Sequence, residues 1–439
     1  MEPKKPKMRK HLCLPGLLKR SRKSFDRIKD TVSRKVTIPL SDCLMSGLAM
    51  FGLKYPSLLQ FDKDFHEEEM VKHNLQTLYG VKQVPSDTYL RERLDEVDPR
   101  YLQKTINRII AQLQRGKVLE QYRYFDDYCL VSIDGSGYFS SKEIHCDACC
   151  MKKHKDGTVT YYHQMLAAVM VHPSNDTVFP LAVEPVQKQD GKTKNDCEHN
   201  AAKRLLENLR TAHPYLKIII VLDGLYADGP IIKLLKKLNF PFIITAKEAD
   251  LKYLFEFYNT VKKSELMTKD SKKEQLYRFA NKLPLNDTNM DLEVNVLECY
   301  EKTEKEAKRF CWITDLPLSD KTVELIAKGG RARWKIENET FNTLKNQGYQ
   351  FEHNFGHGNK NLSTVFAYLM FLAFLIDQVQ QFCCKYFKAA LARWGSRAQV
   401  WQKIRGLFFH YFVDTWEDLY SAIIDKFQGA RLIDRLNTS

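Results

Sequence analysis

The sequence predicts an α/β fold built on a mixed sheet, and two features of the chain support this prediction. Apolar, β-branched runs at residues 128–134 and 216–223 are typical of strands, and the second is apolar enough to be buried on both faces. Segments with helical periodicity, such as residues 196–211 and 229–238, alternate with the later strands. Together these features predict a sheet with helices packed against it.

The order of the elements narrows the fold further. Two strands at residues 158–171 and 177–183 follow the first one, and the turn at 173–176 joins them, so the three strands should be antiparallel neighbours. A helix, the strand at 216–223, a second helix and a strand at 240–246 come next. This is the order of the RNase-H-like fold, in which a right-handed connection places the first and fourth strands side by side.

Two aspartates mark the ends of the strands predicted at residues 128–134 and 216–223. Asp134 precedes Gly135, and Asp223 precedes Gly224, so each aspartate stands where a strand is expected to stop and the chain to turn. An ordinary Asp-Gly turn is the alternative interpretation of each one. Taken together, they lie at the carboxyl ends of two core strands, where open α/β sheets place their sites.

Residues 331–345 supply a third carboxylate. This segment carries two acids, four cations and the indole of Trp334 on roughly four turns of predicted helix. A carboxylate such as Glu337 can hold a hard cation, and the flanking Arg333 and Lys345 can hold phosphates. The segment therefore indicates chemistry on a nucleic-acid backbone, with a solvated helix laced with ion pairs as the alternative.

These motifs resemble those of the DDE transposases of bacterial insertion sequences, the cut-and-paste kind with a large insertion before the final Glu. That family places Tyr, two residues, Arg, three residues, Glu, six residues and Lys around its last carboxylate. Arg333 and Glu337 match this spacing, whereas Gly330 stands at the Tyr position. Lys345 comes one residue late, with Leu344 in its place. The resemblance extends over about residues 124–380.

The resemblance implies a metal-dependent site. Asp134, Asp223 and Glu337 would hold two Mg²⁺ ions about 3.5–4 Å apart, with Asp134 as the bridging ligand and Mn²⁺ as a substitute ion. Glu339 is the alternative to Glu337 as the third carboxylate. Arg333 and Lys345 would bind phosphates near the cut, the arginine bidentately. Water would attack the scissile phosphate, and the freed 3′-hydroxyl would attack again.

Residues 250–316 form the expected insertion, with strands predicted at 276–280, 292–300 and 308–314. Family members use an aromatic residue in the insertion to stack on a flipped base when a hairpin end forms. By that resemblance Phe310 or Trp312 would contact DNA. A core aromatic on a strand is the alternative interpretation.

A second cluster of residues has the chemistry of a metal site. Cys146, Cys149, His154 and His163 form a possible zinc set, in which the C-x-x-C pair supplies two thiolates. A reduced, structural thiol cluster is the alternative. The chain has 11 cysteines, an odd number, and their spacing does not match a disulfide framework. This cysteine usage is expected of a protein in a reducing compartment.

Length, charge and composition agree with a DNA-handling protein of several domains. The 439 residues carry a net charge of +14, which raises affinity for polyanions. We expect a basic tail and helical DNA-binding region at 1–121, a catalytic domain at 122–347 and a helical region at 348–439. A helix-turn-helix near residues 80–86 is one possible DNA reader. Residues 365–376, the longest apolar stretch, are too few to span a bilayer and suit a buried helix.

The sequence therefore predicts a transposase that cleaves and joins double-stranded DNA at the ends of a mobile element and at its target. We expect it in the bacterial cytoplasm, associated with the nucleoid and not with a membrane, and as a homodimer when two ends are held together. A transposase-derived DNA-binding protein that no longer cuts is one alternative. An RNase-H-type nuclease without a role in transposition is another.

Overall fold

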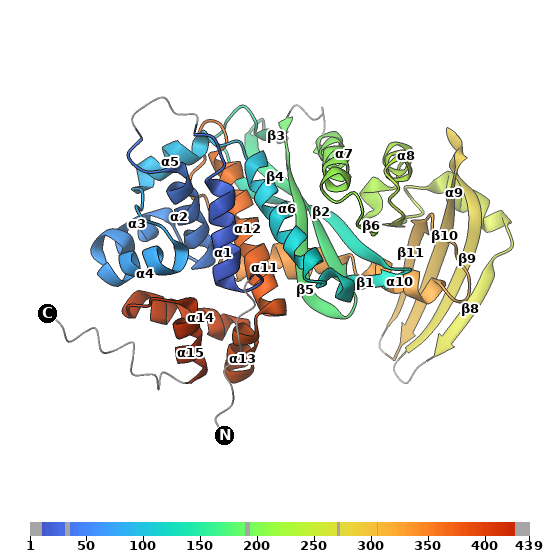
Figure 1. The fold of residues 1–439 in the computed structure, drawn as a ribbon. Helices are drawn as coiled ribbons and strands as arrows, with labels where there is room; N and C mark the ends of the chain where they lie inside the picture. The colour runs from blue at the N-terminus through green and yellow to red at the C-terminus, as the bar shows by residue number, and fades with distance from the viewer. Residues whose placement is uncertain (1–10, 31–35, 189–193, 270–272, 305, 426–439) are drawn as a thin grey trace, which may run out of the picture. The chain divides into compact units, whose positions relative to one another are not determined.

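The computed structural model describes residues 11–30, 36–188, 194–269, 273–304 and 306–425 (Figure 1). The chain forms two compact units, each interrupted in sequence by the other. The sheet unit comprises residues 119–136 and 166–340, and the helical unit comprises residues 1–118, 137–165 and 341–439. Strands β2 (Tyr128–Ser141) and β4 (Val159–His172) run through both units.

Five strands form the core of the sheet in the order β5, β4, β2, β6 and β7. The remaining three are β5 (Asn175–Val186), β6 (Ile218–Leu222) and β7 (Phe242–Thr245). Strand β6 runs parallel to both β2 and β7, while the two-residue connection makes β4 and β5 antiparallel. The predicted RNase-H-like order is confirmed.

Helices cover both faces of this sheet. Figure 1 shows α7 (Lys194–Ala212) and α8 (Gly229–Lys237) on one side of the strands and α10 (Val323–Arg331) on the other. Helix α10 approaches the sheet closely at Gly329, where a Cβ atom would lie 3.2 Å from Ile243. A short 3₁₀ turn and strand, η1 (Leu119–Tyr122) and β1 (Arg123–Phe125), lead into β2.

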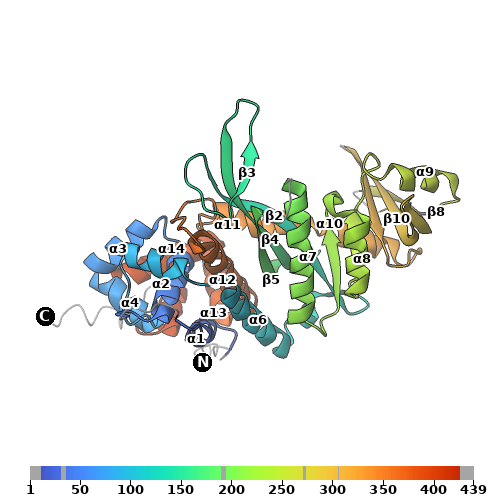
Figure 2. The ribbon, with the colours of Figure 1, turned by 90° about the horizontal axis from the view of Figure 1, so that it is seen from above.

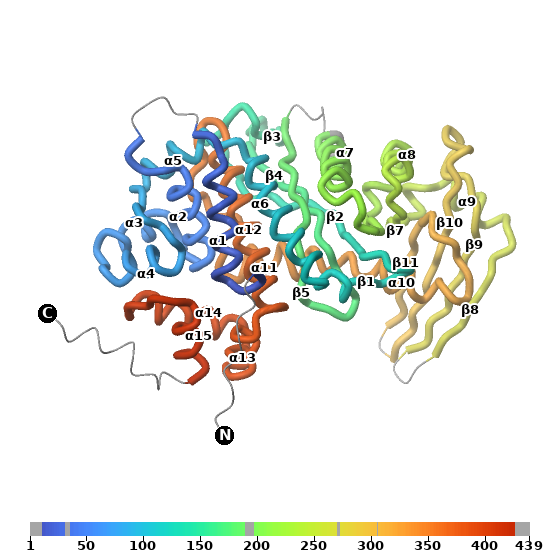
Figure 3. Tube along the Cα trace, viewed as in Figure 1, coloured from blue at the N-terminus to red at the C-terminus, as the bar shows by residue number. Residues whose placement is uncertain are grey.

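The insertion continues the core sheet. Its elements are α9 (Lys252–Thr260), β8 (Ser264–Lys269), β9 (Lys273–Asn286), β10 (Asn289–Thr303) and β11 (Ala307–Thr314). The chain leaves β7 through α9 and returns by β11, which pairs antiparallel with β7 (Figure 3). The three predicted strands are confirmed, but β8 was not predicted. The side chains of β8 are mostly exposed and none is fully buried, as expected of an edge strand, so the strand has no alternating apolar pattern that would predict it.

The helical unit contains most of the remaining helices, which Figure 2 shows from above. Those before the core sheet are α1 (Leu14–Phe25), α2 (Leu40–Gly52), α3 (Leu58–Glu67), α4 (Glu69–Tyr79), α5 (Asp87–Asp95) and α6 (Arg100–Arg115). Those after it are α11 (Asn342–Asn346), α12 (Leu362–Cys383), α13 (Lys385–Trp394), α14 (Arg397–His410) and α15 (Trp416–Ile424). The short strand β3 (Cys150–Lys153) pairs with β4.

Helix α12 is the core of the helical unit and packs against α2, α5 and α6. By length and composition it could cross a membrane, yet 89% of its most apolar window is buried inside the structure, as expected of a core helix. The Asp95 carboxylate caps its N-terminus and accepts hydrogen bonds from four backbone N–H groups, those of residues 359–362. Burial would raise the pKa of Asp95, but these four donors outweigh it and lower the pKa.

Two expectations for the N-terminal helices meet a different structure. The helical periodicity of residues 64–78 predicts a single helix there, but the structure has two, because the backbone of Glu68 is extended between α3 and α4. Residues 80–86 connect α4 to α5, which is longer than the three to four residues typical of a helix-turn-helix. Residues 1–10 of the basic tail lie outside the described residues.

Candidate active site

Asp134 lies inside strand β2 and not at its end. The strand continues through Gly135 and Gly137 to Ser141, so the expectation of a turn after Asp134 was wrong. Neither glycine adopts the positive φ that a turn would use, and both remain extended. The backbone N–H of Gly135 donates a hydrogen bond to Asp134 Oδ1 at 2.8 Å.

Asp223 occupies the predicted position after β6. It caps the 3₁₀ turn η3 (Gly224–Tyr226), and its Oδ1 accepts a hydrogen bond from the N–H of Leu225 at 2.8 Å. Ser132 pairs with Val221 across the parallel ladder of β2 and β6. Asp134 and Asp223 each come two residues after this pair, so the neighbouring strands present both carboxylates at the same level.

Glu337 lies on a π-helical turn. Helix α10 ends at Arg331, and η4 (Ile336–Phe341) is a six-residue π-helix before α11. The continuous helix expected over residues 331–345 is therefore interrupted at two places, after Arg331 and at the π-helical turn. Such π-turns are rare and occur frequently at functional sites.

Arg333 joins two of the three predicted carboxylates. Its Nη1 donates to Glu337 Oε1 at 2.8 Å and lies 3.2 Å from Asp134 Oδ2. The backbone oxygen of Arg333 accepts from Ser132 Oγ at 3.4 Å, which ties the segment to β2. The Arg333 side chain is only 11% exposed, so solvent screens its ion pair with the half-buried Asp134 less than its pair with Glu337, which is 41% exposed. The carboxylate that this arginine connects to Asp134 is thus Glu337, the ligand preferred over the alternative Glu339.

The three carboxylates also interact electrostatically. Burial raises the pKa of Asp134 to about 6, even though the Gly135 N–H and the Arg333 charge lower it. The charges of Glu337 and Asp223 raise the pKa of Asp134 further. Asp134 is half-buried and repelled by two neighbouring carboxylates, and a divalent cation with oxygen ligands fits this donor set.

Side chains from α7 brace the turn that carries Asp223. Glu198 is buried and accepts a hydrogen bond from Tyr226 at 3.0 Å, and His199 lies 3.1 Å from Asp228. The hydrogen bond to Asp228 raises the pKa of His199. In the sequence, Asp196 and Glu198 at the start of this helix are explained by capping and by the helix dipole, which predicts no catalytic role for this stretch. A Glu-His pair at the start of a helix gave no sign that it supports a turn more than 20 residues away.

The predicted DNA-binding aromatics of the insertion differ in exposure. Trp312 is buried, stacks on Phe310 at 6.0 Å and faces Gly330, whereas Phe310 is half-buried beneath Arg331. This burial favours the core interpretation of Trp312. Trp334 is the aromatic next to Arg333 and is 56% exposed.

Lys345 belongs to the helical unit and is half-buried. Its Nζ forms an ion pair with Glu352 Oε1 at 2.7 Å. Leu344, which occupies the expected position of the family lysine, is fully buried. The Lys345 side chain, one position later, is therefore the one that reaches solvent.

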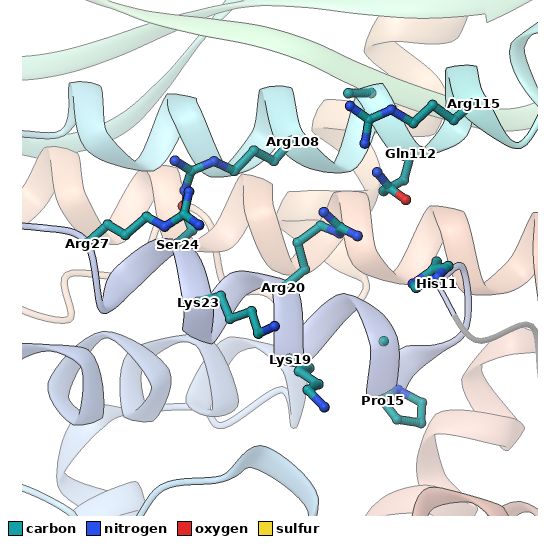
Figure 4. Close-up of a pocket in the computed structure, with 12 residues that line it drawn as sticks. His11, Pro15, Lys19, Arg20, Lys23, Ser24, Arg27, Arg108, Gln112 and Arg115 are labelled. Carbon is teal, nitrogen blue, oxygen red and sulfur yellow. The ribbon is translucent and has the colours of Figure 1, made fainter.

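A groove of about 640 Å³ in the helical unit is lined by cations from facing helices. Figure 4 shows side chains of α1 and α6 reaching into it. We call it the basic groove; its charged lining residues are Lys19, Arg20, Lys23, Arg27, Arg108 and Arg115, and none of the described residues that line it is acidic. Burial and then the neighbouring charge of Arg115 lower the pKa of Arg20, and burial with the charges of Arg27 and Arg20 lowers that of Arg108.

The predicted zinc set is corrected in one ligand. Within the described part of the chain, one group of His, Cys, Asp and Glu side chains has ligand atoms gathered at metal-binding distances: Cys146, Cys149, His163 and His357. His154 is not in this group, because its Nε2 lies 2.8 Å from Thr160 Oγ1. His357 was missed since it lies almost 200 residues after His163, and only the flanking Gly356 and Gly358 set it apart.

Comparison with known families decides the identity of the chain. Residues 139–376 match the family described as "Transposase DDE domain", which is more than half of the 439 residues. The chain belongs to the DDE transposases. It is thus a DNA-cleaving enzyme of DNA transposition. The matched range includes Asp223 and Glu337 and begins five residues after Asp134.

Two solved structures resemble this transposase only distantly. One is a piggyBac transposase synaptic complex with hairpin DNA, with 10% identity, a TM-score of 0.38, and coverage of 98% of this chain and 81% of that one. The other is the NurA nuclease from Sulfolobus solfataricus, with 11% identity, a TM-score of 0.25, and coverage of 57% and 97%. Neither TM-score is high enough to indicate a shared fold. No curated protein matches the chain.

Proposed function

We propose that this transposase cleaves and joins double-stranded DNA at the ends of its element with Asp134, Asp223 and Glu337 as the ligands of two Mg²⁺ ions. The observation that carries this proposal is the position of Arg333 between Asp134 and Glu337, close to the turn that Asp223 caps. Two bound Mg²⁺ ions would supply the positive charge that activates the attacking water and stabilises the leaving 3′ oxygen.

The residues around the carboxylates position the DNA. Arg333 uses one nitrogen for both carboxylates, so its other N–H groups remain to bind a phosphate oxygen. The exposed ring of Trp334 lies beside it and offers a surface on which a base can stack. Phe310, half-buried beneath Arg331, is a second aromatic that can contact DNA.

The late position of Lys345 follows from the π-turn. A π-helix bonds residue i to residue i+5 and takes one residue more per turn than an α-helix. A side chain after η4 is therefore displaced by one position relative to an unbroken helix. We propose that Lys345 serves as the family lysine for this reason, and that the departure from the motif does not signal an inactive enzyme.

The basic groove supplies a second DNA contact within the helical unit. Several like charges held together without an acidic partner among the lining residues are costly unless an anion neutralises them. The phosphates of a DNA backbone would do so and would release counterions. Because cationic side chains bind the phosphates of any sequence, the groove would position DNA on the protein.

A cleavage assay tests the proposed active site. Full-length protein is incubated with Mg²⁺ and a duplex carrying the DNA that flanks its gene, and wild type is compared with Asp223→Ala. We expect cuts at the element ends and joining to a target plasmid for wild type, and neither for Asp223→Ala. Asp250→Ala is the matched control, because Asp250 is an exposed aspartate of the same unit.

The same assay separates the alternatives. Wild type that binds the ends but cuts with neither Mg²⁺ nor Mn²⁺ would be a DNA-binding relic. Cutting of any duplex without preference for the ends would indicate an RNase-H-type nuclease.

Cut-and-paste transposition holds two DNA ends together, so we also propose that the protein is a homodimer on DNA. Cleavage at full rate by a single protomer on one end would contradict this proposal. The net charge of +14 further supports our proposal that the protein acts on the bacterial nucleoid, which cell fractionation would check.

A further inference from the structure

The Cys146, Cys149, His163 and His357 cluster has the dimensions of a tetrahedral metal site. The two sulfurs lie 3.9 Å apart, and His163 Nε2 lies 3.5 Å from Cys146 Sγ and 3.3 Å from Cys149 Sγ. His357 Nε2 lies 3.6 Å from Cys149 Sγ, and all four ligand atoms are within 4.8 Å of one another. Zn–S and Zn–N bonds of about 2.3 and 2.0–2.1 Å put tetrahedral neighbours about 3.3–3.8 Å apart, so these spacings fit a zinc ion.

The backbone around the two cysteines is shaped for such a site. The N–H of Cys149 donates to the oxygen of Cys146 at 3.1 Å, which closes a tight turn over the C-x-x-C segment. The N–H of Cys146 donates to Cys149 Sγ at 3.5 Å, a contact that stabilises a thiolate. The turn therefore presents both sulfurs toward the same point.

Aromatic side chains hold the two imidazole rings. Phe139 stacks on His357 with ring centroids 4.2 Å apart, and Tyr138 stacks on His163 at 5.6 Å. Both histidines and Cys149 are buried, whereas Cys146 is half-buried. Nδ1 of His357 has no hydrogen-bond partner, so stacking and not a hydrogen bond sets the orientation of this ring. Such a site is closed to solvent on most sides, as structural zinc sites are.

We propose that this transposase carries one structural zinc ion, bound by Cys146, Cys149, His163 and His357. Two thiolates and two imidazoles in tetrahedral array select zinc over the hard Mg²⁺ of the carboxylate site. The ligands come from the connection between β2 and β3, from β4, and from the connection between α11 and α12. The ion would link these three segments of the helical unit across about 200 residues of sequence, independently of the catalytic proposal.

The metal content of the full-length protein tests this proposal. We expect about one zinc per chain, by mass spectrometry, in protein purified without a chelator and without a metal-binding tag. X-ray absorption should show two sulfur and two nitrogen ligands, and Co²⁺ exchanged into the site should give the visible bands of tetrahedral cobalt–thiolate. Folded wild type with zinc far below one per chain, or with iron in its place, would overturn the proposal.

A pair of histidine variants identifies the fourth ligand. His357→Ala should lose zinc, while His154→Ala, which alters a histidine of the neighbouring hairpin, should retain it. The reverse result would refute the ligand set. If His357→Ala does not fold, wild type decides the matter: a zinc chelator should loosen the hairpin and speed trypsin cleavage at the exposed Lys152 and Lys153, and unchanged cleavage would contradict a structural ion.

Discussion

A Cβ atom at Gly330 would lie 2.4 Å from Nε1 of Trp312. The family tyrosine therefore has no room at this position, because the buried indole of the insertion fills the space. The absence of the family tyrosine at residue 330 and the burial of Trp312 therefore have one structural cause, the close packing of the two residues.

We expect Gly330→Ala to destabilise the protein by about 1–3 kcal/mol, because the methyl group overpacks against Trp312. Thermal unfolding would measure this loss. The matched control is Gly406→Ala in α14, where nothing lies within 4 Å of a Cβ atom and alanine should stabilise the helix by about 1 kcal/mol. Equal effects of the two substitutions would contradict the packing at Trp312.

Arg333→Gln should separate metal binding from catalysis. In the metal-free protein Arg333 neutralises Asp134 and Glu337, so its loss should enlarge the thermal stabilisation that Mg²⁺ produces. DNA cleavage should nevertheless fall by about 10²- to 10³-fold, because the phosphate loses a charged donor. Asp134→Asn should abolish the Mg²⁺ effect on the unfolding temperature. An Arg333→Gln enzyme that cuts normally would show that this arginine has no role in the reaction.

Lys345 can be tested by moving the lysine. Lys345→Ala should weaken cleavage of end DNA, and Lys345→Arg should preserve most of it. The double variant Leu344→Lys/Lys345→Leu restores the family spacing, yet we expect it to be inactive and less stable, because residue 344 is fully buried. Recovery of activity by this variant would mean that the π-turn does not set the lysine position.

His213 should make the protein sensitive to mild acid. Burial lowers the pKa of His213 to about 4 from 6.5, and its Nε2 has no hydrogen-bond partner. The unfolded chain therefore binds more protons between pH 6.5 and pH 4, so stability falls as the pH falls through this window, by up to about 3 kcal/mol. Denaturant unfolding of His213→Leu should show a smaller acid loss, whereas His66→Gln, at an exposed histidine, should behave as wild type.

The basic groove predicts a change in salt dependence. Arg20→Gln and Arg108→Gln should each weaken binding to any duplex and lower the slope of log affinity against log salt by about 0.9. Lys63→Gln, at an exposed lysine of α3, is the control in the same unit. Slopes identical to wild type would exclude the groove from DNA binding.

Sequence alone predicted the parts of the molecule that depend on local pattern. The apolar runs ending near Asp134 and Asp223 identified two core strands, and their parallel pairing brought the two carboxylates level. The pairing of Arg333 with Glu337 follows from helical spacing. The contact of Arg333 with Asp134 depends on the fold and was not predicted, because the sequence suggested only phosphates as partners of this arginine.

Other features depend on contacts that no local pattern contains. The π-turn at Glu337 was not visible, because the same residues suit an α-helix. His357 joins Cys146 and Cys149 only through the packing of the chain around α12, so a nearer histidine, His154, was chosen. Trp312 and Gly330 likewise meet only when the insertion pairs with the core sheet.

The direct pairing of β11 with β7 has a consequence for how this protein can change. Residues 250–316 cannot be excised as a self-contained cassette, because their removal would leave the backbone groups of β7 as a bare sheet border beside the catalytic strands. An unpaired edge strand of this kind pairs readily with strands of other chains and so promotes aggregation. A shortened relative would therefore have to shield β7 by other means, and a deletion variant without the insertion should precipitate before its chemistry can be measured.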